Sequence, residues 1–147
     1  MTLSPRRLQR LVKHRERIER LQEERFADAQ RQHVRRELAI AEAEARRDGV
    51  YEAGAPASGN IEPAELVAAA AYLARLKREI GARKAALVHS AETVAAERRQ
   101  LMERRRDRKA METLLEHRFE EERTWRNRHE IGQIDEAAGR GWLANER

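Results

Sequence analysis

The feature that most constrains the fold is a seven-residue repeat of apolar side chains in the second half of the chain. Its members fall at strict intervals of seven: Leu66, Leu73, Ile80, Leu87, Val94 and Leu101, with Leu115 continuing the series after Arg108. A repeat of this period is typical of a helix that packs along a coiled-coil seam. It predicts one long helix with a partner helix beside it.

The composition agrees with a helical chain. Ala, Glu, Lys, Arg and Leu make up 91 of the 147 residues, a composition typical of long helices and coiled coils. Leu, Ile, Val and Phe number only 27, too few for a sandwich, a barrel, a dinucleotide-binding sheet or an enzyme with a deep apolar pocket. We therefore predict an all-α fold.

Turn-forming residues gather in one stretch, residues 48–60, which holds three of the seven glycines. Ser4 and Pro5 form a helix start, and Asn60 and Pro63 mark a second one. The expected boundaries are a helix over about 5–47, a loop over 48–60, a helix over about 61–138 and a short tail over 139–147. These elements form one coiled-coil domain, 1–147, an antiparallel two-helix coiled-coil hairpin with unequal arms.

The apolar residues of the first arm follow a less regular pattern. Their spacing fits a 3.6-residue period better than a strict heptad, which predicts only weak supercoiling. The stripe consists of Leu8, Leu11, Ile18, Phe26, Val34 and Leu38.

The second arm is much longer than the first. If the arms pair from the loop outward, the first arm ends opposite roughly residue 106, and residues 107–138 have no cover in the same chain. This uncovered stretch is amphipathic, and its apolar members are Met111, Leu114, Leu115, Phe119, Trp125, Ile131 and Ile134. A lone helix gains little from propensity alone, so we expect another copy or another protein to pack there.

Positive charge is concentrated in residues 98–109, where seven basic and two acidic residues give a net charge of +5. This cluster either contacts phosphate or an acidic protein or is a solvated helix surface. No aromatic residue interleaves the basic ones, which argues against nucleic acid.

Enzyme and metal motifs fail on inspection. His129-Glu130 begins like a zinc helix, but Gln133 stands where the second histidine is needed. We expect no enzymatic activity, no cofactor and no metal. The longest apolar run, Leu66 to Ala74, is too short to span a membrane, and the N-terminus lacks a secretory signal, so a cytoplasmic location is expected.

Three segments resemble the flagellar export protein FliJ family. They are Tyr72-Leu73-x-x-Leu76-x-x-x-Ile80, the run from Leu101-Met102-Glu103 through Arg106-Asp107-Arg108-Lys109 to Leu114-Leu115, and the ending Glu130 to Ala137. The resemblance covers nearly the whole chain, including the order of short arm, loop and long arm. The injectisome counterpart of the YscO type has a similar plan and stays an alternative.

The resemblance implies a cytoplasmic component of a bacterial type III export apparatus, peripherally associated with the inner face of the cell membrane. Such proteins look like the coiled-coil part of the rotary-ATPase γ subunit, and they bind the export ATPase ring, the cytoplasmic domain of the export gate and export chaperones. By this resemblance Tyr72 and Leu76 match gate-contacting positions, although Leu76 is equally an ordinary seam residue.

For the ring we predict contacts from the basic cluster and from the apolar residues that follow it. The basic candidates are Arg104, Arg105, Arg106, Arg108 and Lys109, and the apolar candidates are Leu114, Leu115, Phe119 and Trp125. Two other interpretations are a self-assembling structural coiled coil and, less favoured, a nucleic-acid-binding helical protein.

Overall fold

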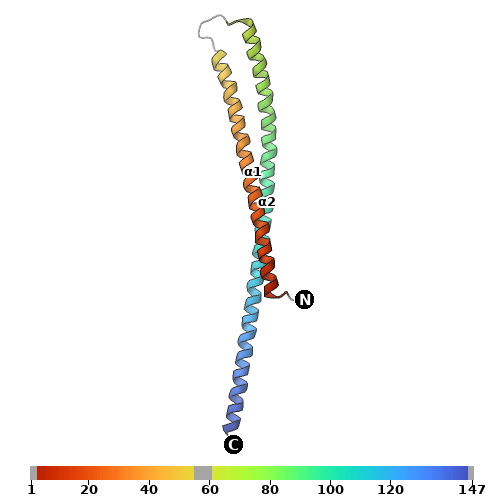
Figure 1. The fold of residues 1–147 in the computed structure, drawn as a ribbon, viewed down its shortest axis with the longest axis vertical. Coiled ribbons are helices and arrows are strands. Elements are labelled where there is room, and N and C mark those ends of the chain that lie inside the picture. Colours follow the sequence, from red (N-terminus) through yellow and green to blue (C-terminus); the bar gives the residue numbers. More distant parts are fainter. Residues whose placement is uncertain (1–2, 55–60, 146–147) are drawn as a thin grey trace. The chain divides into compact units, whose positions relative to one another are not determined.

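The computed structural model describes residues 3–54 and 61–145, and these residues form two helices and no strand. They are α1 (Pro5–Gly54) and α2 (Pro63–Asn145), joined as a hairpin (Figure 1). The predicted all-α, two-helix hairpin with a longer second arm is confirmed. The chain divides into a central unit, Leu21–Met102, and a terminal unit, Met1–Arg20 with Glu103–Arg147. Each contains a segment of both helices.

Both helices run further than the sequence predicts. α1 ends at Gly54 rather than 47, and α2 ends at Asn145 rather than 138. The turn prediction for 48–54 is therefore wrong, while residues 55–60 lie outside the described part of the chain. Gly49, Gly139 and Gly141, which were expected to end helices, all lie within helix. None of them adopts the positive φ with which glycine ends a helix. A helical glycine costs only about 1 kcal/mol relative to alanine, too little to stop a long helix by itself.

The helix starts follow their capping chemistry. At α1 the carbonyl of Ser4 accepts hydrogen bonds from the N–H groups of Arg7 and Leu8 at 2.9 and 3.0 Å, with Pro5 in the first helical position as predicted. At the start of α2, the carbonyl of Glu62 accepts hydrogen bonds from the N–H groups of Glu65 and Leu66 in the same way. The second helix thus starts at Pro63, two residues later than expected.

The seam of α2 is the one that the heptad predicts. Leu76, Ile80 and Leu101 are buried, and Leu73, Leu87, Val94 and Leu115 are half-buried. Leu66, the first member of the series, is exposed.

The seam of α1 differs from the predicted stripe. Its inward positions also recur every seven residues, at Val12, Glu19, Phe26, His33 and Ile40, all buried or half-buried. Leu8 and Ile18 of the predicted stripe face inward as well, but Leu11, Val34 and Leu38 are exposed. The 3.6-residue interpretation is therefore wrong, because polar residues occupy part of a true heptad seam.

In the terminal unit, α1 covers more of α2 than expected. Ser4, Pro5, Arg6 and Gln9 line one groove together with Phe119 and Glu122, so the start of α1 lies beside the turn at 119–122. The expected end of cover near residue 106 is wrong.

Candidate partner-binding surfaces

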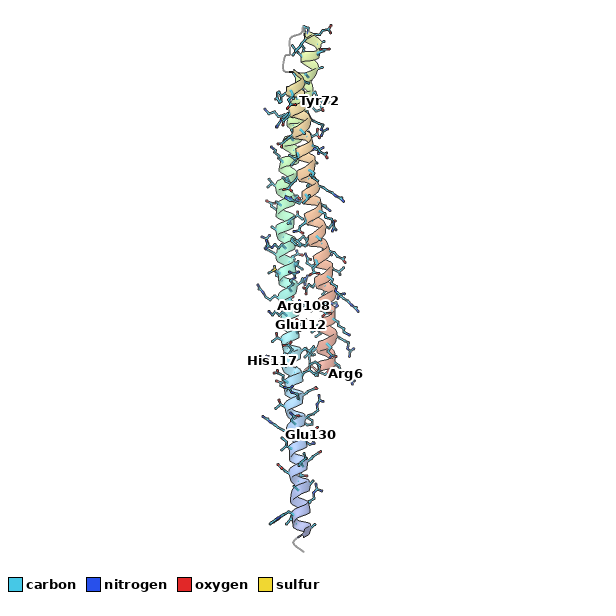
Figure 2. The ribbon with its side chains drawn as sticks, turned by 90° about the vertical axis from the view of Figure 1, so that its left-hand side faces the viewer. Arg6, Tyr72, Arg108, Glu112, His117 and Glu130 are labelled. Atoms are coloured by element: carbon cyan, nitrogen blue, oxygen red, sulfur yellow. The ribbon has the colours of Figure 1, made fainter. Side chains whose placement is uncertain are left out.

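The terminal unit contains a stretch of α2 that no part of α1 covers. Figure 2 shows Glu130 well beyond the level of Arg6, where α2 continues without α1 beside it. Every described residue from Phe119 to Ala144 is exposed. We call residues 123–144 the lone helix.

The lone helix is amphipathic. Ile131, Ile134, Ala138 and Trp142 follow one another at steps of three, four and four residues and so share one face. Ile131, Ile134 and Trp142 are 58, 65 and 66% exposed. Large apolar side chains that line up at this exposure mark a surface for a partner.

Trp125 lies elsewhere on the lone helix. It precedes Ile131 by six residues, which places it about 120° around the helix from the apolar face. Its ring stacks on His129, with centroids 5.2 Å apart and planes at 7°. Trp125 is exposed, but it lies on a different side of the helix from Ile131 and Trp142.

A buried carboxylate connects α1 to α2 in the terminal unit. Glu19 is only 7% exposed, accepts a hydrogen bond from Arg108 and forms an ion pair with Arg105 at 3.4 Å. Arg108 also donates to Glu112 at 2.7 Å (Figure 2). The hydrogen bonds to Glu19 and Glu112 raise the pKa of Arg108 above its usual value.

These contacts divide the predicted basic site. Arg105 and Arg108 are engaged within the chain, whereas Arg104, Arg106 and Lys109 are exposed and form no ion pair among the described residues. Arg15 and Asp107 add a further ion pair between the helices at 3.2 Å. The side chains available to a partner are therefore Arg104, Arg106 and Lys109.

The predicted apolar contacts are divided in the same way. Leu115 is half-buried in the seam with α1, while Leu114 and Phe119 are about 40% exposed. Trp142 was missed as a site residue, because residues 139–147 were expected to form a tail. Continuing the spacing of Ile131 and Ile134 by two further turns would have found it.

The other predicted site lies in the central unit. Leu76 is 2% exposed and belongs to the core, so its side chain is not accessible to a partner. Tyr72 is half-buried, with the guanidinium of Arg75 5.7 Å from its ring centre. Tyr72 lines a groove of about 420 Å³ that also includes Val50, Leu66 and Ala69.

The polar residues that α1 contributes to the seam of the central unit, Gln22 and His33, were not identified from sequence. Gln22 donates to the carbonyl of Glu97 at 3.1 Å, His33 lies 3.1 Å from the hydroxyl of Ser90, and Arg83 donates to the carbonyl of Ala39 at 3.2 Å. Pairs of this kind satisfy groups that would otherwise be buried without partners. They explain why apolar periodicity alone gave the wrong face for α1.

No group of three or more His, Cys, Asp or Glu side chains is arranged to hold a metal ion in residues 3–54 and 61–145. Within the same residues, neither helix has a stretch apolar and long enough for a bilayer.

Comparison with known protein families identifies the family of this chain. The model of the family described as flagellar FliJ protein matches residues 4–147, nearly the whole chain. No curated protein and no solved structure matches. The family consists of structural components of flagellar protein export. With its two-helix hairpin and this match, the chain belongs to the flagellar FliJ protein family and is a component of the flagellar protein export apparatus.

Proposed function

We propose that the chain is a non-enzymatic, stalk-like coiled coil that docks on the export ATPase ring through the lone helix. The proposal rests on one observation: the lone helix exposes a continuous apolar face made by Ile131, Ile134, Ala138 and Trp142. Membership of an export-apparatus family supports a partner within that apparatus.

The energetics favour a partner at this face. A helix without tertiary packing is marginal in water, because propensity alone scarcely offsets its entropy cost. Covering an Ile or Trp side chain contributes roughly 1.5–3 kcal/mol when burial is complete. Covering the exposed parts of Ile131, Ile134 and Trp142 would therefore contribute several kcal/mol to docking.

The mechanism we propose is mechanical and allosteric. A single helical element inside a ring of identical sites contacts them unequally, and unequal contacts bias their conformations. Arg104, Arg106 and Lys109 would meet acidic groups at the ring mouth, and Phe119 and Trp125 would add apolar contact. Arg105 and Arg108 would act indirectly, by holding α1 against α2 through Glu19.

For the export gate we propose the groove beside Tyr72 as the contact. Its lining is mainly apolar and combines both helices of the central unit, with Val50 from α1 and Leu66 from α2. Leu76 would support this groove from the core rather than touch the gate. Handling of export chaperones and peripheral association with the cell membrane belong to the same proposal.

The test compares two single substitutions on neighbouring residues of the lone helix. Ile134→Ser removes an apolar side chain from the shared face, whereas Gln133→Ser changes the opposite face. We expect Ile134→Ser to weaken co-purification with the export ATPase and its stimulation, and Gln133→Ser to leave both intact. Equal behaviour of the two variants would contradict docking through this face.

A second candidate is a self-assembling coiled coil, in which the lone helix packs on another copy. The same exposed apolar face favours it, because two such faces can cover each other. Sedimentation over a range of concentrations separates the candidates: an Ile134-dependent dimer supports self-assembly, and a persistent monomer excludes it.

A further inference from the structure

Five cations form a single row on α1 within the terminal unit. Arg6, Arg10, Lys13, Arg17 and Arg20 follow one another at steps of four, three, four and three residues, and all five are exposed. This spacing puts them on one face of a helix. We call these residues the cationic row.

Arg10, Lys13, Arg17 and Arg20 lie on the side of α1 that faces away from α2, while Arg6, in the first turn, also lines the groove beside Phe119 and Glu122. Leu8 and Val12, which alternate with the cationic row, are 1 and 8% exposed and pack inward, as does Glu19. The apolar face of this segment is therefore already used within the hairpin. Figure 2 shows Arg6, the first member, at the start of α1.

The charges of the row are not balanced within the chain. None of its five members forms an ion pair among the residues the structure describes, although Arg15 and Glu19 on the inner side do. Like charges at steps of three and four residues destabilise a helix. The row therefore leaves five cations available to opposite charge on a partner.

We propose that the cationic row binds an acidic helix of a partner protein, along the outer face of α1. Successive cations rise by about 4.5–6 Å along the helix axis. Carboxylates at steps of three and four residues on a second helix repeat at the same rise, so two such helices can pair charge by charge. The surface is distinct from the lone helix, and the inference does not depend on ring docking.

The other polyanions fit less well. A helix that binds an anionic bilayer inserts an apolar face flanked by cations, but here Leu8 and Val12 are committed to α2. Binding of single-stranded nucleic acid uses aromatic side chains for stacking, and residues 3–20 contain no Phe, Trp or Tyr. A single narrow row of cations therefore fits an acidic helix better than an anionic bilayer or a single-stranded nucleic acid.

The test uses the full chain and a synthetic amphipathic peptide with glutamates at steps of three and four residues on one face. A peptide of the same composition in scrambled order is the matched probe. In the row variant, Arg6, Arg10, Lys13, Arg17 and Arg20 are replaced by Gln. In the control variant the same substitution is made at four arginines and one lysine that are exposed in the central unit, Arg35, Lys77, Arg78, Arg98 and Arg99.

We expect the row variant to lose about tenfold or more in affinity for the patterned peptide, and the control variant about threefold or less. The wild-type chain should prefer the patterned over the scrambled peptide, and binding should weaken as salt rises. Circular dichroism checks that both variants stay helical. The proposal fails if the two variants lose affinity equally, if the scrambled peptide binds as well, or if phosphatidylglycerol vesicles or duplex DNA bind the row more tightly than the peptide.

Discussion

Replacing Leu76 with alanine tests whether this residue is structural. Leu76 is 2% exposed in the seam of the central unit, so truncation removes buried methyl groups and leaves a cavity between α1 and α2. Substitutions of this kind cost about 2–5 kcal/mol. A two-helix seam can partly collapse around the cavity, so we expect the lower half of that range, about 2–3 kcal/mol.

The matched control is Leu38→Ala. Leu38 has the same side chain on α1 of the same unit but is 59% exposed, so its truncation removes little buried surface. Substitutions at such positions usually change stability by less than about 0.5 kcal/mol. The pair compares one chemical change on the inner and outer sides of the same hairpin.

The assay is urea unfolding followed by circular dichroism. We expect the midpoint to fall for Leu76→Ala at an unchanged slope, and the melting temperature to fall by roughly 5–10 °C. Leu38→Ala should match the wild type. A stable Leu76→Ala, or an equal loss from Leu38→Ala, would refute the assignment of inner and outer faces.

Two further predictions concern ion pairs between the helices. Glu19→Ala should lower the free energy of unfolding, measured in urea, by about 2 kcal/mol; this is less than the usual 3–5 kcal/mol for a broken buried ion pair, because solvent still reaches Arg105 and Arg108. The control Glu24→Ala, at an exposed position, should leave the free energy of unfolding almost unchanged. Equal losses from the two variants would contradict the role of Glu19. The hydrogen bond and ion pair with Lys84 lower the pKa of Glu44 below its usual value, so the folded state binds fewer protons there than the unfolded state. The stability from this pair should therefore be lost as the pH falls through the lowered pKa of Glu44. Lys84→Met should raise the pKa of Glu44 measured by NMR titration, and an unchanged value would disprove the contact.

The success of the α2 prediction and the failure of the α1 prediction have one cause. In α2 apolar residues occupy the seam at Leu73, Ile80, Leu87 and Leu101, so apolar periodicity found the inner face. In α1 the seam contains Glu19 and His33, while Val34 and Leu38 face solvent. Polar seam residues become recognisable only when their partners on the other helix are known, and a single sequence does not give the register.

The same missing register limited the site prediction. An α1 ending opposite residue 106 made Leu115 a free surface residue, whereas the observed pairing reaches the turn at 119–122 and half-buries it. Arg105 and Arg108 were expected to be free because their partner Glu19 lies 86 and 89 residues away in sequence. Composition and spacing did identify Ile131 and Ile134, whose exposure depends only on α2 extending beyond the start of α1.

Hydrogen exchange of the full chain, measured with and without the export ATPase ring, tests the docking proposal most directly. Without the ring, amides of the lone helix should exchange faster than those of the paired part of α2, because they lack tertiary packing. With the ring, we expect protection to rise chiefly in residues 123–144. Unchanged exchange there on a ring-bound chain, or protection confined to the hairpin around Tyr72, would contradict docking through the lone helix.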